Sequence, residues 1–144
     1  MNTPQLPSTP QSPVRRLAAG EDCYGEWRGL GVSTLNFKVV PQDGSGLLIV
    51  ENIFHSKGGP ARHLHYEQDE WFYCLEGTFI LEVGNERLRL NPGDSLLAPR
   101  QVPHVWGYSG AAQGRMLITF APAGKMESFF REVTKANAMP PQDP

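Results

Sequence analysis

Four residues in the middle of the sequence have the types and spacing of a metal-binding site. His63 and His65 are separated by one residue, and side chains at i and i+2 of an extended strand project from the same face. Both imidazoles can therefore reach one point. Glu70 follows four residues later and opens an apolar run, while His104 lies on a later run that begins at Pro103. Histidine and carboxylate donors together form the ligand set of non-haem iron sites.

Short β-like runs separated by Gly, Pro, Asn and Asp fill the chain from about residue 26 onward, a pattern typical of an all-β sandwich or barrel. The predicted strands are 33–40, 46–54, 70–75, 79–83, 87–90, 95–98, 103–108 and 115–120. These runs suffice for two facing sheets. The short connections 84–86 and 91–94 predict two local hairpins, so neighbouring strands are expected to be mostly antiparallel.

One amphipathic helix is predicted over residues 125–136. Met126, Phe129, Phe130 and Val133 have the i, i+3, i+4, i+7 spacing of an apolar helix face. This helix would follow the last predicted strand and end the folded part of the chain.

The two ends of the chain are rich in proline. Prolines recur every third residue from Pro4 to Pro13, which favours extended backbone and predicts a disordered tail over residues 1–18. Residues 138–144 are predicted to be a flexible tail. The sequence between them, 19–137, is predicted to be a single domain with its core at about 46–120.

Composition argues against several kinds of partner. The net charge is −2 and charged residues make up 19% of the chain, so neither nucleic acid nor a membrane surface is an expected partner. The longest aliphatic stretch, 47–50, is far shorter than the roughly 20 residues of a membrane helix. The N-terminus has no secretory pattern, so a cytoplasmic location is expected, where Cys23 and Cys74 would be thiols.

The motifs that carry the four candidate ligands resemble those of the cupin superfamily, in particular small single-domain cupins similar to quercetin dioxygenases. The first motif reads Gly58, four residues, His63-Leu-His65, four residues, Glu70, six residues and Gly77. The second reads Gly93, five residues, Pro99, four residues and His104. The resemblance covers about residues 46–120, and the predicted helix is similar to the closing helix of such cupins.

This resemblance implies a jelly-roll fold, the double-stranded β-helix or cupin barrel, with one short C-terminal helix. It also implies that His63, His65, Glu70 and His104 bind one divalent metal ion per chain, and no other cofactor is expected. Fe(II) or Mn(II) is favoured, and Ni, Cu or Zn also suits the donor set. In related dioxygenases the glutamate also removes a substrate proton, which makes Glu70 the candidate catalytic residue.

Three positions depart from the family pattern, and none is a ligand. Gly58 is one residue closer to His63 than usual, and Tyr108 stands where an asparagine is common. Gln101 replaces the later glycine of the second motif, a position where glycine would tolerate positive φ more readily.

Some nearby residues have two open interpretations. Phe72 shares the strand parity of Glu70, and Trp106 and Tyr108 share that of His104, so all three could line the cavity or pack in the core. Glu51 interrupts an apolar run and is either a partner of the metal ligands or a residue on the outward side of its strand.

The expected function is that of a metal-dependent, dioxygenase-like enzyme acting on a small enolic or aromatic substrate. A metal-dependent isomerase, lyase or decarboxylase remains an alternative, as does a non-catalytic cupin that binds a small ligand. Small cupins commonly pair through sheet edges and N-terminal strands, so the resemblance also implies a homodimer.

Overall fold

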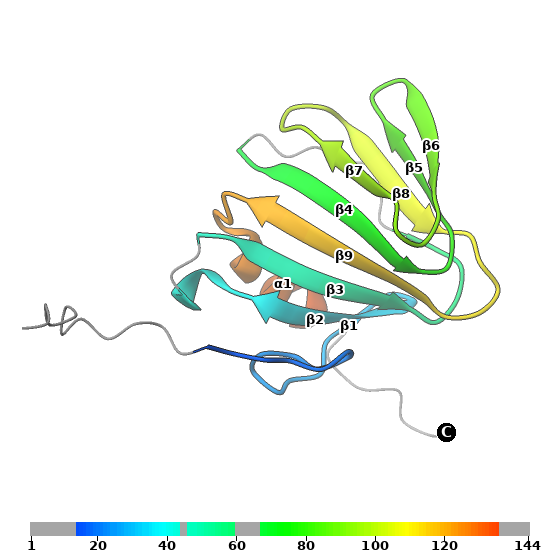
Figure 1. Ribbon diagram of the computed structural model, residues 1–144. Coiled ribbons are helices and arrows are strands. Elements are labelled where there is room, and N and C mark those ends of the chain that lie inside the picture. The colour runs from blue at the N-terminus through cyan, green and yellow to red at the C-terminus, as the bar shows by residue number, and fades with distance from the viewer. Residues whose placement is uncertain (1–13, 44–45, 60–66, 136–144) are drawn as a thin grey trace, which may run out of the picture.

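The computed structural model describes residues 14–43, 46–59 and 67–135, which form two β-sheets and one α-helix (Figure 1). The strands are β1 (Gly29–Leu30), β2 (Ser33–Val39), β3 (Leu48–Phe54), β4 (Asp69–Glu76), β5 (Phe79–Val83), β6 (Glu86–Leu90), β7 (Ser95–Ala98), β8 (His104–Tyr108) and β9 (Gly114–Ala121). The helices are the 3-10 turn η1 (Pro41–Asp43) and α1 (Met126–Lys135). All eight predicted strands and the predicted helix are present, each with ends within two residues of those expected.

The strands form the two antiparallel sheets of a jelly roll, as predicted. The larger sheet has the order β1-β2-β3-β9-β4-β7, and the smaller has the order β6-β5-β8. Helix α1 packs on the inner side of the larger sheet, where the ring of Phe130 lies 5.5 Å from that of Phe120 on β9. The barrel interior is therefore enclosed by the two sheets and by one face of α1.

Alternation along the strands decides which side chains form the core. On β4, Phe72 and Cys74 are fully buried, and the register places them beside Ile118 and Met116 of β9. Even-numbered positions of β4 and β9 thus face inward, and Glu70 shares that parity.

Only one of the two predicted hairpins forms. Residues 84–85 do join the antiparallel pair β5 and β6, but the turn at 91–94 carries the chain from the smaller sheet to the larger one. The second hairpin prediction is therefore wrong. The reason is long-range: Gly93 N–H donates to Cys74 O at 2.8 Å and Cys74 N–H donates to Asp94 O at 2.9 Å, so the turn is bound to β4.

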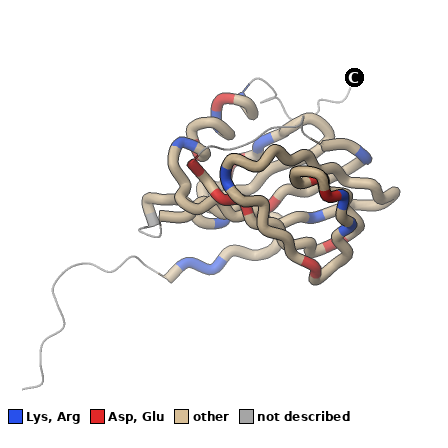
Figure 2. The backbone as a smooth tube through the Cα atoms, turned by 90° about the horizontal axis from the view of Figure 1, so that it is seen from above, with Lys and Arg blue, Asp and Glu red and all other residues tan. Residues whose placement is uncertain are grey.

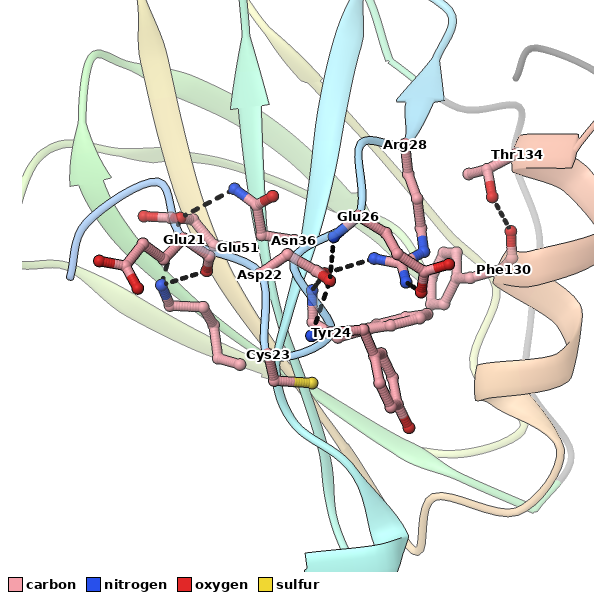
Figure 3. Close-up of polar contacts among 12 residues, drawn as sticks. Glu21, Asp22, Cys23, Tyr24, Glu26, Arg28, Asn36, Glu51, Phe130 and Thr134 are labelled. Carbon is pink, nitrogen blue, oxygen red and sulfur yellow. Dashed lines mark hydrogen bonds and ion pairs between the residues drawn. The ribbon is translucent and has the colours of Figure 1, made fainter. Parts of the chain in front are cut away.

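The segment before β1 lies along the edge of β2 and contributes buried polar contacts (Figure 3). Cys23 N–H donates to Phe37 O at 2.8 Å, and Asp22 Oδ1 accepts from Phe37 N–H at 2.7 Å. Lys38 Nζ donates to Ala18 O at 2.9 Å, so contacts with the sheet begin before residue 19. The predicted tail boundary at 18 stays a prediction, as does the C-terminal tail, because residues 1–13 and 136–144 lie outside the described part.

The distribution of charged residues in the described part of the chain agrees with its small net charge. Basic and acidic residues are interspersed along the backbone (Figure 2). None of the described helices has the length and apolar character needed to cross a bilayer. Cys23 and Cys74 form no disulfide.

Candidate metal centre

The fold brings Glu70 and His104 into direct contact although 34 residues separate them in the sequence. Glu70 is the second residue of β4 in the larger sheet, and His104 is the first residue of β8 in the smaller sheet. Nε2 of His104 lies 2.6 Å from Oε2 of Glu70, and each residue is 2% exposed. Two of the four predicted metal ligands thus meet between the sheets.

The hydrogen bonds of His104 fix which ring nitrogen faces Glu70. Nδ1 lies 3.1 Å from Val102 O, and because a carbonyl oxygen only accepts, Nδ1 carries a proton and donates it. A single proton then lies between Nε2 and Oε2, whether it belongs to the imidazole or to the carboxyl group. Removal of that proton leaves an imidazole lone pair and a carboxylate oxygen, which are both donor groups that a divalent ion binds.

The turn before His104 contains an unusual backbone conformation. Gln101 has a φ of 67°, in the left-handed region where glycine is more common. The turn is closed by Val102 N–H donating to Pro99 O at 3.3 Å, and it presents Val102 O to the imidazole. Gln101 therefore adopts the conformation that a glycine would have supplied there.

A cavity of about 720 Å³ opens beside Glu70, between the larger sheet and α1. Apolar side chains make up most of its described wall: Leu30, Val32, Leu35, Phe54, Trp106, Ile118, Met126, Phe129, Phe130 and Val133. Polar side chains contribute at Ser33, Asn52, Glu67, Gln68, Glu70 and Lys125. Such a wall suits a mainly apolar molecule that carries a few polar groups.

The aromatic residues singled out from the sequence occupy different places. Trp106 lies in the cavity wall. Phe72 and Tyr108 are not among the described wall residues: the ring of Phe72 lies 6.1 Å from that of His104, and Tyr108 packs 5.1 Å from Phe79. Phe72 thus supports the imidazole from the core side.

His63 and His65 fall within residues 60–66 and lie outside the described part of the chain, so their place at the centre stays a prediction. The residues that flank this segment, Gly59 and Glu67, both line the same cavity as Glu70. At Gly59 a Cβ atom would lie 2.1 Å from Trp106 O, so only glycine allows this close approach to β8.

Comparison with known proteins agrees with the fold and the motifs. Residues 52–120 match the family model described as the cupin domain. Residues 52–120 form a cupin domain. Among solved structures, an RmlC-like cupin from Shewanella frigidimarina matches with a TM-score of 0.66 at 21% identity, covering 81% of this chain and 98% of that one. KdgF from Halomonas sp. matches with a TM-score of 0.60 at 21% identity, covering 70% and 90%. At these identities the likeness establishes the fold.

Several relatives are named as dioxygenases. The 3-hydroxyanthranilate 3,4-dioxygenase of Xenopus laevis is 41% identical over 49 residues, which are 34% of this chain and 17% of that protein. The quercetin 2,3-dioxygenase of Bacillus subtilis is 35% identical over 69 residues, which are 48% of this chain and 20% of that protein. The matched segments therefore span a fifth or less of these two relatives.

Glu51 lies on the outward side of its strand, away from Glu70 and His104. It is 1% exposed, and it accepts from Arg115 Nη2 at 2.5 Å and from Gly20 N–H at 3.0 Å, with Lys38 Nζ at 3.7 Å. Burial by itself raises the pKa of Glu51, but the hydrogen bond from Arg115 and the charge of Lys38 outweigh it, so the pKa is lowered. Figure 3 shows its carboxylate beside Asn36.

Asn52 lies in the cavity wall of the cupin, and this position was not predicted from the sequence. Its parity is the signal that could have identified it, because it alternates with Val50 and Phe54, which face inward. An amide at an inward position of an apolar strand is buried here, with 2% of its surface exposed.

Proposed function

We propose that this cupin is a metal-dependent, dioxygenase-like enzyme that acts on a small enolic or aromatic substrate in the cavity beside Glu70. The observation that carries the proposal is the 2.6 Å contact between Glu70 Oε2 and His104 Nε2, next to a largely apolar cavity of about 720 Å³. A buried carboxylate and imidazole that share one proton are well suited to exchange that proton for a divalent ion.

His63 and His65 would complete the ligand set. On an extended strand, their spacing would put both imidazoles on one face. Gly59 and Glu67, the described residues on either side of these histidines, both line the cavity beside Glu70, which supports the proposal that the two histidines belong to the same site. Fe(II) or Mn(II) is the metal that we favour for this mixed donor set, with Ni, Cu or Zn as alternatives.

In the proposed reaction, different residues of the chain would remove the substrate proton and bind the substrate. A bound divalent metal would supply Lewis acidity toward an enolic or phenolic oxygen and reactivity toward dioxygen. Glu70 would take the proton from the substrate hydroxyl at its carboxylate oxygen. Trp106, Phe54 and the inner face of α1 would hold the apolar part of the substrate and exclude water. The dioxygenase names of the relatives from Xenopus laevis and Bacillus subtilis support this class of chemistry.

Metal analysis of untagged protein, reconstituted anaerobically with Fe(II) or Mn(II), should give about one ion per chain. Glu70→Gln should lower metal occupancy or, where metal is retained, lower turnover by at least about 100-fold, since a general base contributes that much. Glu67→Gln is the matched control, because it changes an exposed carboxylate in the same cavity wall.

Oxygen consumption during turnover separates the dioxygenase from other metal-dependent reactions. Quercetin and 3-hydroxyanthranilate are the first substrates to test with an oxygen electrode. A metal content far below one ion per chain after reconstitution would contradict the metal site. Turnover without oxygen consumption would contradict the dioxygenase and favour an isomerase, lyase or decarboxylase.

A further inference from the structure

We infer that Asn52 is a specificity-determining residue of the cavity, whose Oδ1 atom accepts a hydrogen bond from a hydroxyl or N–H group at the far end of the ligand. The inference rests on the proposed function in taking this cavity as the substrate site. It adds the requirement that the substrate carries a hydroxyl or N–H group at the end distant from Glu70.

The orientation of the Asn52 amide is fixed by strand β2. Nδ2 lies 2.9 Å from Ser33 Oγ and 2.9 Å from Thr34 O. Thr34 O can only accept, and the hydroxyl proton of Ser33 is donated to Leu30 O at 2.8 Å, so Ser33 Oγ must accept from Asn52. Both neighbours therefore require the NH₂ group, and Oδ1 is the remaining atom.

Oδ1 of Asn52 faces open space inside the barrel. No donor among the described residues reaches it, whereas every fully buried polar side-chain atom in that part of the chain has a hydrogen-bond partner. Oδ1 must therefore remain accessible. Because Asn52 is 2% exposed and lines the cavity, the accessible side is the cavity.

The immediate surroundings of Oδ1 are apolar. Leu35 lies directly opposite Asn52 across the β2–β3 pair, and Phe54 follows it on the same face of β3. An acceptor in such surroundings penalises a ligand that removes its water without offering a donor. A ligand with a hydroxyl or N–H group at this point is therefore preferred over the same molecule with that group blocked.

The strand register places Asn52 well away from Glu70. Met116 of β9 lies beside both Asn52 and Cys74, and Cys74 is four residues along β4 from Glu70. This corresponds to about 13 Å along the strands and about 10 Å across two of them. A ligand that reaches both residues is elongated and longer than two directly joined aromatic rings.

The test uses 4-hydroxybiphenyl and 4-methoxybiphenyl, which differ in one hydrogen-bond donor. Binding to the metal-free protein is measured by quenching of tryptophan fluorescence, because Trp106 lies in the cavity wall. We expect the wild type to bind the hydroxyl compound about fivefold more tightly, which is the value of one neutral hydrogen bond. Asn52→Leu should reduce this preference to about onefold.

Asn36→Leu is the matched control, because it makes the same substitution at a buried amide of β2 that contacts Gly20 and Glu51 and is not in the described cavity wall. It should keep the preference of the wild type, and thermal unfolding checks that both variants are folded. The inference is overturned if the wild type shows no preference, if Asn52→Leu retains it, if Asn36→Leu loses it equally, or if neither probe binds up to its solubility limit.

The proposed function and the role of Asn52 can be contradicted independently of each other. The probe experiment uses neither metal nor dioxygen, so a preference that depends on Asn52 stands even if metal analysis contradicts the proposed function. A chain that binds one metal ion and consumes oxygen but shows no such preference retains the proposed function and loses the inference.

Discussion

The imidazole of His104 is oriented by its own turn. Val102 O, two residues earlier, accepts from Nδ1 at 3.1 Å, and the preceding Gln101 adopts a φ of 67° to present that carbonyl. Nε2 is then directed at Glu70 across the barrel. A local backbone conformation thus decides the geometry of a contact between two sheets.

Replacement of Gln101 tests the cost of this conformation. A left-handed φ costs a residue with a Cβ about 1–2 kcal/mol, and glycine loses about 0.5–1 kcal/mol through the entropy of the unfolded chain. Gln101→Gly should therefore raise the free energy of unfolding by about 0.5 kcal/mol in urea titrations, and Gln101→Val should lower it by about 1–2 kcal/mol. Equal stabilities of the two variants would contradict the assigned conformation.

Glu51 predicts how stability depends on pH. Its pKa in the folded protein lies below its ordinary value of 4.5, so the folded state binds the proton more weakly than the unfolded chain does. Its contribution to stability is thus complete above pH 4.5 and is lost as the pH falls toward the folded pKa. Glu51→Gln should lower the free energy of unfolding by about 2 kcal/mol at pH 7, because Arg115 and Lys38 lose a charged partner. It should also make the free energy of unfolding fall less steeply as the pH is lowered.

Urea unfolding of the metal-free protein between pH 3 and pH 7 provides the measurement for Glu51. Curves of stability against pH that run parallel for the wild type and for Glu51→Gln would show that this carboxylate does not contribute to the acid sensitivity.

At the scale of elements, the segment before β1 protects the edge of β2. Asp22 holds it there, accepting from the N–H groups of Tyr24 at 2.9 Å, Glu26 at 3.1 Å and Phe37 at 2.7 Å. Arg28 forms a buried ion pair with the same carboxylate, and its guanidinium lies 4.0 Å from the centre of the Phe37 ring. The edge that an open sheet would leave unpaired is covered by the chain itself.

Loss of the Asp22 carboxylate should strongly lower the free energy of unfolding, because it removes the contacts that bind this segment to β2. Asp22→Ala leaves the buried guanidinium of Arg28 without its main partner, and we expect a loss of about 3–5 kcal/mol in the free energy of unfolding. Glu26→Ala is the control, since Glu26 is half exposed in its ion pair with Arg28 and should cost less than about 1 kcal/mol. Similar losses in the two variants would argue against this role of Asp22.

At the scale of the whole molecule, the outer face of the larger sheet carries exposed apolar side chains beside its edge strand β7. Leu97 is 56% exposed and Trp71, its neighbour across the β4–β7 pair, is 36% exposed. The ring of Tyr73 lies 5.6 Å from that of Trp71. An apolar group of this kind at a sheet edge suits contact with a second copy of the chain.

We therefore expect a homodimer that uses the outer face of β4 and β7. Light scattering should give twice the chain mass of 16.0 kDa, and Leu97→Lys should shift the mass toward that of the monomer. Leu88→Lys is the control, because Leu88 is 39% exposed on β6 of the other sheet. A monomer mass for the wild type at micromolar concentrations would contradict the dimer.

Much of the fold was predictable because it depends on local patterns. Alternating apolar residues located the strands within two residues, and the spacing of Met126, Phe129, Phe130 and Val133 located α1. The resemblance of the two motifs to those of cupins also predicted that Glu70 and His104 belong to one ligand set. The strands and the helix follow from the period of each element, which neighbouring residues are enough to specify.

Only the tertiary structure decided the features that depend on contacts between distant strands. Residues 91–94 look like a hairpin locally, but hydrogen bonds to Cys74 on β4 turn them into a crossing between sheets. Glu51 could have faced either way until its pairing with Arg115 on β9 was known, and the free Oδ1 of Asn52 depends on Ser33 of β2. Pairing of distant strands sets these directions, and no local period encodes it.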